Sequence, residues 1–213
     1  MIVLTGDLVD SNHTDMEVAL DFAKQATELA PVYYVTGNHE SWLGHSYMVL
    51  ETQLNECGVH VMRDEALFLE AEDDRILLIG MDDPEFYEGD QTAYDGGASQ
   101  MALRIRMLRE HNEEYTILLS HRPELFDTYS ECEVDLVFFG HAHGGQFRFP
   151  LVGGLVAPNQ GLFPEYDAGV YEKNNTCMIV SRGLGNSIIP IRIGNRPEIV
   201  VAELHCNEKE RQK

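Results

Sequence analysis

Side chains that can bind metal ions stand at the ends of four short apolar runs in this 213-residue chain. The side chains at these four ends are Asp7, Asn38, His121, and the pair His141 and His143. A carboxylate, an amide oxygen and several imidazoles form a mixed nitrogen and oxygen ligand set. Such a set suits Mn, Fe or Zn and fits poorly with the all-oxygen sites of Ca or Mg. The residue types therefore predict a divalent metal centre.

The pair of histidines two residues apart is the strongest single signal. Glycines flank it in the segment Gly140-His141-Ala142-His143-Gly144-Gly145, and glycine lets a backbone approach a ligand closely. Taken alone, a histidine after a strand is more often a hydrogen-bonded core or surface residue, and a Gly-Asp step is usually a turn. One layout repeated in four places favours a metal site over that structural interpretation.

The elements that must position these side chains alternate between strands and helices. Apolar runs predict strands at residues 1–4, 32–35, 59–61, 67–69, 76–79, 116–119 and 136–139. Apolar residues at helical spacing predict helices over 16–29, 47–54 and 100–109. Sites in α/β sheets form at the carboxyl ends of strands, so we expect the four polar ends to meet at one rim.

The last part of the chain is predicted to be rich in strands, at 178–180, 188–193 and 199–204. Alternating elements followed by such a tail indicate a layered α/β architecture, in one domain over residues 1–213. No apolar run approaches the roughly 18 residues that a membrane helix needs. Four cysteines lack metal-site or disulfide spacing and are expected to be free thiols: Cys57, Cys132, Cys177 and Cys206.

The charge balance limits the partners. With 15 Lys and Arg against 36 Asp and Glu, the formal net charge is −21. This charge argues against binding nucleic acid or an anionic membrane surface through broad electrostatics. A phosphate substrate would also be repelled, unless bound cations reverse the sign of the field locally.

Four motifs together resemble the calcineurin-like metallophosphoesterase superfamily. They are Gly6-Asp7-Leu8-Val9-Asp10, Gly37-Asn38-His39-Glu40, Ser120-His121 and Gly140-His141-Ala142-His143. Segments 154–158 and 181–187 add a likeness to the YkuE-like bacterial branch, so that the resemblance covers nearly the whole chain. It implies an α/β fold, the calcineurin-like four-layer αββα sandwich, in which two mixed sheets pack together with helices outside.

The resemblance also implies a site for two metal ions, of Mn, Fe or Zn. Asp7 would bridge both ions. The shell of the first ion would be completed by Asn38, His121 and His141. His143 would bind the second ion.

Two further residues acquire catalytic roles from the same resemblance. His39 would bind no metal and would protonate the leaving oxygen, while Asp10 would hydrogen-bond His39 and raise its basicity. The implied activity is hydrolysis of a phosphomonoester or phosphodiester by a metal-activated hydroxide. The alternative is a non-catalytic metal-binding or interaction protein. His39 and Asp10 favour the enzyme, since neither is needed merely to hold a metal.

One family motif is absent: the chain contains no Asp-x-His. Family members carry a further strand and helix before the position of Gly6, so we expect Met1 to be an internal methionine or alternative start of a longer protein. On that expectation the first strand and helix of the sandwich are missing, and the second ion keeps only two protein ligands. The chain would then be weakly active or inactive, and prone to self-association through an unpaired strand edge.

The substrate and the cellular location stay open at this level. A phosphorylated small molecule and a phospholipid-type substrate both fit the same metal core, and an upstream segment could carry an export signal or a membrane anchor. Four more residues are candidates to line the cleft or complete the ligand set, although a turn or loop role explains each equally well or better. They are His45, Asp82, Asp83 and Arg182.

Overall fold

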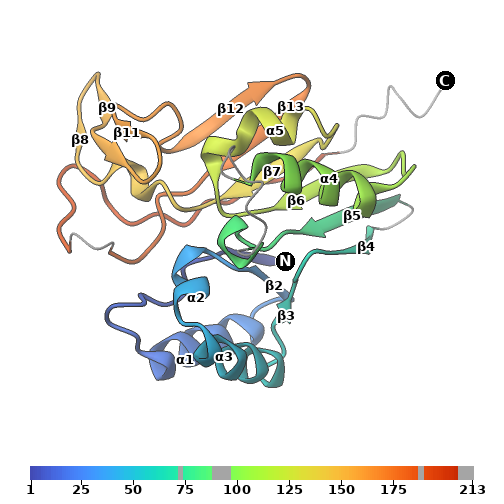
Figure 1. Ribbon diagram of the computed structural model, residues 1–213, viewed down its shortest axis with the longest axis horizontal. Helices are drawn as coiled ribbons and strands as arrows, with labels where there is room; N and C mark the ends of the chain where they lie inside the picture. Colours follow the sequence, from blue (N-terminus) through green and yellow to red (C-terminus); the bar gives the residue numbers. More distant parts are fainter. Residues whose placement is uncertain (72–73, 88–96, 187–189, 206–213) are drawn as a thin grey trace.

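Two main β-sheets form within residues 1–71, 74–87, 97–186 and 190–205, which the computed structural model describes (Figure 1). The smaller sheet has three strands in the order β1 (Ile2–Thr5), β2 (Val32–Val35) and β3 (His60–Val61). All of them run parallel. Parallel neighbours need crossover connections, and helices supply both of them here.

The larger sheet is mixed. Its six strands lie in the order β12 (Gly169–Lys173), β13 (Thr176–Val180), β7 (Leu136–Phe139), β6 (Tyr115–Leu119), β5 (Asp74–Gly80) and β4 (Glu65–Ala71). The four central strands are parallel, and the outer strands β12 and β4 run antiparallel to their neighbours. Central parallel strands are covered on both faces, which explains why β6 is a continuous apolar run rather than an alternating one.

Helices cover the outer face of each sheet, which gives four layers. α1 (Met16–Thr27) and α3 (His45–Glu56) pack on the smaller sheet, and α4 (Ala98–Arg109) and α5 (Phe126–Ser130) pack on the larger one (Figure 1). An apolar layer between the sheets includes Val35, Leu78, Ile117, Leu119 and Leu136. The predicted αββα sandwich is therefore confirmed, with one refinement: only the larger sheet is mixed.

Shorter elements occupy the loops beyond the carboxyl ends of the strands. They are α2 (Asn38–Trp42), η1 (Pro84–Tyr87), η2 (Pro123–Leu125) and η3 (His143–Gly145). Two small antiparallel pairs follow η3, namely β8 (Arg148–Phe149) with β9 (Gly153–Gly154), and β10 (Val156–Ala157) with β11 (Gly161–Leu162). The described cysteines Cys57, Cys132 and Cys177 are free thiols, as expected, and Cys206 lies outside the described residues.

The prediction of two late strands is wrong. Residues 199–204 form no strand, and of 188–193 the described part only bridges Ile193 to Phe147. Pro190 and Pro197 remove backbone donors near these segments. Ile199 remains 77% exposed, so its hydrophobic side chain is not buried in a sheet. The segments are apolar, but among the described residues no strand pairs with them beyond the single bridge of Ile193 to Phe147. Residues 187–189 lie outside the described part.

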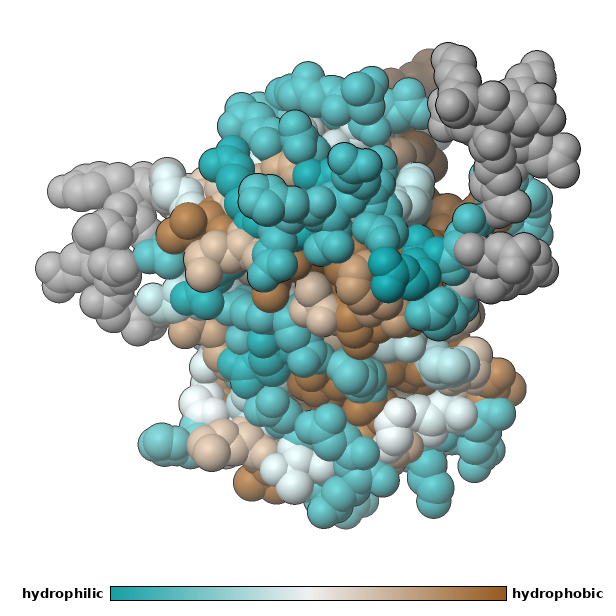
Figure 2. Space-filling view, turned by 90° about the vertical axis from the view of Figure 1, so that its right-hand side faces the viewer, coloured by the Kyte–Doolittle hydropathy of each residue, from teal (hydrophilic) through white to brown (hydrophobic). Residues whose placement is uncertain are grey.

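The surface reflects the layered arrangement. Figure 2 shows the right-hand side of Figure 1, where hydrophobic residues gather in a band across the middle of a largely hydrophilic face. The band lies at the height where the two sheets meet, between polar upper and lower parts. Among the described residues, no helix has both the length and the apolar character needed to cross a membrane.

Candidate metal centre

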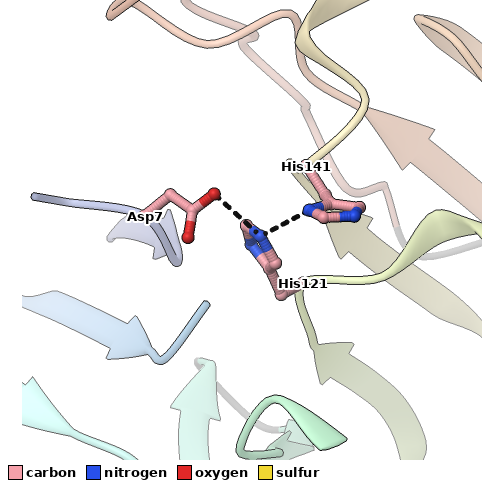
Figure 3. A group of neighbouring side chains, drawn as sticks. All are labelled: Asp7, His121 and His141. Carbon is pink, nitrogen blue, oxygen red and sulfur yellow. Dashed lines mark hydrogen bonds and ion pairs between the residues drawn. The ribbon is translucent and has the colours of Figure 1, made fainter. Parts of the chain in front are cut away.

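The candidate centre lies where strands of both sheets end. Asp7 follows β1, Asn38 follows β2, His121 follows β6, and His141 follows β7. Since β1 and β2 belong to the smaller sheet and β6 and β7 to the larger one, the two packed sheets contribute jointly. Figure 3 shows three of these side chains pointing toward one another from their separate loops.

Distances around one nitrogen define the cluster. His121 Nε2 lies 3.1 Å from Asp7 Oδ2, 3.2 Å from Asn38 Oδ1 and 3.0 Å from His141 Nδ1. One ligand atom from each of Asp7, His121 and His141 falls within 4.8 Å of the others. Four candidate ligand atoms thus converge on one small volume.

The protonation of His121 decides what this convergence means. Its Nδ1 lies 2.6 Å from the carbonyl oxygen of Thr5, and because a carbonyl only accepts, Nδ1–H must be the donor. In the neutral ring, Nε2 then carries a lone pair that faces two oxygens and another nitrogen. In the imidazolium form a single Nε2–H could serve only one of them well. A cation would satisfy all of these atoms at once.

One buried atom supports this interpretation. Asp7 Oδ2 is inaccessible to solvent, and apart from its 3.1 Å contact with His121 Nε2, itself a candidate ligand atom, it has no hydrogen-bond partner in the described part of the chain. Buried polar atoms are normally satisfied, so unsatisfied ones require an explanation such as an ion that binds there. The residues present therefore fit a divalent metal with mixed nitrogen and oxygen ligands.

The opposite charges of Asp7 and His121 shift the pKa values within the cluster. Burial opposes ionisation of Asp7, yet the charge and hydrogen bonding of His121 hold the pKa of Asp7 well below its usual value. Burial likewise disfavours the imidazolium of His121, but Asp7 outweighs it and raises the pKa of His121 to about 9. Burial and the charge of His121 lower the pKa of His141, which favours the neutral ring that a metal requires.

Glycine allows the strand ends to approach this closely. A Cβ on Gly37 would lie 2.3 Å from Asp7 Oδ1, and a Cβ on Gly6 would lie 2.5 Å from His121 Nδ1. Asp7 and His141 themselves have positive φ angles of 52° and 60°, which non-glycine residues rarely adopt. Such backbone conformations persist where the surrounding structure enforces them, and they cluster at functional sites.

His143 follows His141 by two residues and begins η3. It also has a positive φ, of 49°, and burial lowers its pKa to about 4. The charges of Asp7 and His121 both influence its pKa. The structure gives no direct contact between His143 and the other candidate ligands within the described residues.

His39 lies beside the cluster, but its partner differs from the predicted one. Its Nδ1 accepts a hydrogen bond of 3.0 Å from the backbone N–H of Ser11. The carboxylate of Asp10 stays 3.6 Å away and instead accepts the N–H of Asn12. The expected hydrogen bond between His39 and Asp10 is therefore not formed, because Ser11 already occupies the Nδ1 position.

Glu40 is a buried residue to which the sequence assigned no role. Its carboxylate accepts four backbone N–H groups, at 2.7 to 3.3 Å, from Gly37, Asp7, Leu8 and Val9. Burial and the negative charge of Asp7 raise the pKa of Glu40 to about 7. The side chain thus ties the Asp7 loop to the start of α2. A glutamate at the third helical position after Gly37 is the sequence signal that could have indicated this.

Two of the four further candidate residues, Asp82 and Asp83, form ion pairs with arginines. Arg63 Nε donates to both oxygens of Asp82 at 2.6 and 2.7 Å, and Arg122 holds Asp83 through two hydrogen bonds of 2.6 and 2.8 Å. His45 is exposed at the first residue of α3. These three residues lie outside the converging group, which supports the turn interpretation of Asp82 and Asp83.

Comparison with known proteins decides the family. The family model described as "Calcineurin-like phosphoesterase" matches residues 1–145, more than half of the chain. The chain belongs to the calcineurin-like phosphoesterase family. All the candidate ligands of this calcineurin-like phosphoesterase lie inside the matched residues. Metal-dependent hydrolysis of phosphoric esters is accordingly its class of reaction.

Individual relatives extend the likeness over 96% of the chain. The uncharacterized metallophosphoesterase YkuE of Bacillus subtilis is 28% identical over 208 residues, which cover 96% of this chain and 67% of YkuE. Phosphodiesterase YaeI of Escherichia coli is 26% identical over 207 residues, 96% of this chain and 70% of YaeI. The crystal structure of calcineurin-like phosphoesterase YfkN from Bacillus subtilis superimposes with a TM-score of 0.51 at 15% identity, covering 85% of this chain and 67% of YfkN, and supports the fold.

Proposed function

We propose that this calcineurin-like phosphoesterase hydrolyses a phosphomonoester or phosphodiester with one divalent ion held by four side chains, Asp7, Asn38, His121 and His141. The observation that carries the proposal is the convergence of an oxygen of Asp7 and one of Asn38, together with His141 Nδ1, on His121 Nε2. Asp7 and His143 supply ligands for a second ion. Two protein ligands are fewer than the three or four usual for a firmly held catalytic ion, so the second ion binds more weakly.

The chemistry of the donor set limits the metal to Mn, Fe or Zn rather than Ca or Mg. Such an ion supplies charge neutralisation at the phosphoryl oxygens and lowers the pKa of bound water toward neutrality. The positive charge of the ion also offsets locally the repulsion that a chain of net charge −21 exerts on a phosphate.

His39 is proposed to protonate the leaving oxygen. Because its Nδ1 accepts the N–H of Ser11, a neutral His39 carries its proton on Nε2. Its own backbone N–H donates to Asp7 Oδ1 at 3.0 Å, which fixes the residue beside a candidate ligand. The ring of Trp42 packs against it with the ring centroids 4.8 Å apart. His39 is thus held beside the cluster by contacts that metal binding alone does not require.

The test is Asp7→Ala, with metal content and hydrolysis measured on the same preparation. Loss of Asp7 should abolish both bound Mn or Zn and hydrolysis of p-nitrophenyl phosphate and bis(p-nitrophenyl) phosphate. Asp21→Ala is the matched control, since Asp21 is exposed on α1 and bonds only Gln25 among the described residues. If Asp7→Ala binds the metal as tightly as the parent, the ligand assignment is wrong.

A further inference from the structure

A polar hollow adjoins the loop that carries His143. It has a volume of about 890 Å³, and its lining residues include Arg182, Arg192, Asn195, Arg196 and Glu198. They belong to the segment that follows β13 and runs back past the loops at the rim (Figure 1). Three arginines in one hollow stand out in a chain with 15 basic and 36 acidic residues.

The lining of the hollow contacts the loop that carries His143. Asn195 Nδ2 donates to the carbonyl of His143 at 2.6 Å and to that of Gln146 at 3.2 Å. A Cβ on Gly144 would lie 2.4 Å from Asn195 Oδ1 and 2.6 Å from Arg182 Cγ, so only glycine permits this contact. Arg192 Nη1 donates to the carbonyl of Arg182 at 2.9 Å, and the side chain of Arg182 lies against Gly144, the residue after His143.

Two of the three arginines lack a carboxylate partner. Arg182 Nε donates to Glu198 Oε2 at 2.7 Å. Arg192 donates to the backbone carbonyls of Arg182 and Gly185, and its Nε is buried without an acceptor in the described part of the chain. Neither Arg192 nor Arg196 forms an ion pair with any residue that the structure describes.

The other arginines that are buried or half-buried in the described chain each form an ion pair with a carboxylate. The pairs include Arg63 with Asp82, Arg104 with Asp64, Arg122 with Asp83 and Arg148 with Asp167. With acidic residues in such excess, uncompensated guanidinium groups beside the reaction centre attract an external anion. A planar guanidinium is well suited to the oxygens of a phosphate or carboxylate.

We propose that Arg192, assisted by Arg196, binds a second anionic group of the substrate, in the hollow next to His143. The substrate class is then a phosphoester that carries another phosphate or carboxylate at a distance from the phosphoryl group that reacts. This inference rests on the proposed function, because it takes the metal centre as the place where the first phosphoryl group binds. A purely structural role for Arg192 accounts for its two bonds to carbonyls. It does not account for the second arginine, Arg196, which is exposed in the same hollow and forms no ion pair with a described residue.

The experiment compares two kinds of ligand on the Mn-loaded full chain by calorimetry. The first kind is a series of α,ω-alkylene bisphosphonates with three to six methylenes, and the second is the alkyl monophosphonates of equal length. At one length or more, the parent should bind the bisphosphonate about 10-fold or more tightly than its monophosphonate, as a charge-assisted hydrogen bond implies. Arg192→Met should remove that preference and leave the monophosphonate affinity within about twofold, since the metal centre is intact. Arg192→Lys should retain part of the preference.

The control variant is Arg75→Met, which removes an arginine on β5 that pairs with Glu114. It should behave as the parent. Equal affinity for the two ligand kinds in the Mn-loaded parent would overturn the subsite, as would an Arg192→Met variant that keeps the preference. A variant that loses both affinities together with its Mn would show that Arg192 only supports the loop. If the proposed function is wrong, the parent itself retains no Mn by elemental analysis. That result can be told apart from failure of the subsite, in which the parent retains Mn.

Discussion

Two buried polar clusters lie at neighbouring strand ends, and they differ in how far their bonding is complete. In the cluster after β5, which we call the closed cluster, each acid accepts two hydrogen bonds from one arginine. Arg63 donates to Asp82, and Arg122 donates to Asp83. In the cluster around His121, the open cluster, ligand-type atoms face one another, and the buried Asp7 Oδ2 has no hydrogen-bond partner among the described residues apart from His121 Nε2. The sequence alone suggested carboxylates at both places.

The comparison teaches that burial and charge do not by themselves identify a site. Each acid of the closed cluster has a base that satisfies it, so removal of one partner leaves the other charge buried and unpaired. The open cluster has more acceptors than donors, and an ion is what such a set lacks. Substitutions in the two clusters should therefore fail in different ways.

The largest expected effect is on turnover, through His39 beside the open cluster. His39→Ala should lower the rate by on the order of 10²–10⁴ for substrates with poor leaving groups, as loss of a positioned acid usually does. Metal content should stay at the parent level. The rate loss should shrink for aryl phosphates, whose leaving groups need no proton. His60→Ala, an exposed histidine paired with Glu65, is the control, and equal losses for good and poor leaving groups would contradict the assigned role.

The next effect is on stability, in the closed cluster. Asp83→Ala leaves the buried guanidinium of Arg122 without its two-point partner, and breaking a buried pair costs roughly 3–5 kcal/mol of unfolding free energy. Metal content per folded chain should not change. Urea unfolding with elemental analysis checks both. Asp127→Ala, which removes an exposed partner of Lys173, should cost under about 1 kcal/mol. Loss of metal in Asp83→Ala would contradict the separate roles assigned to the two clusters.

A smaller effect should follow from adding metal. Saturating Mn at about 100 times its dissociation constant stabilises the folded chain by about 2.7 kcal/mol, because the ion binds the assembled open cluster. Asp7→Asn should abolish this gain, whereas Asp83→Ala should keep it in full despite its lower starting stability. Thermal unfolding with and without Mn measures the difference. A gain that survives in Asp7→Asn would place the ion elsewhere.

The smallest effect concerns Asp10. Because the backbone of Ser11 already holds His39 Nδ1, Asp10→Ala should lower turnover by less than about tenfold. Ser11→Ala keeps that backbone N–H and removes only the Ser11 hydroxyl, which also lies 3.0 Å from His39 Nδ1, so its effect should be of the same small size. Steady-state rates on one alkyl phosphate decide the matter. A loss as large as that of His39→Ala would mean that Asp10, now 3.6 Å from the ring, bonds His39 in the working enzyme.

Much of the architecture was predictable because its signals are local. The apolar runs of β2 and β7 match their predicted bounds, and polar residues at strand ends pointed correctly to one rim. The strands predicted at residues 188–193 and 199–204 were wrong because an apolar pattern does not reveal whether a neighbouring strand exists. Pairing depends on residues far away in the chain.

The site was partly predictable for the same reason. The structure brings Asp7, Asn38, His121 and His141 together, as the four-fold repetition of one layout suggested. The contacts that set their chemistry were not predictable. Thr5 fixes the His121 tautomer through a carbonyl, and Ser11 displaces Asp10 through an N–H. Backbone atoms carry no sequence signal, so such contacts emerge only from the fold.

The central claim is that the open cluster around His121 Nε2 is a metal site, and an anomalous-difference map from Mn-soaked crystals tests it most directly. The account predicts a strong peak about 2.0–2.3 Å from His121 Nε2, with oxygens of Asp7 and Asn38 and a ring nitrogen of His141 completing the shell. A peak that lies away from His121, or a fully Mn-saturated crystal in which His121 Nε2 hydrogen-bonds to protein, would contradict it.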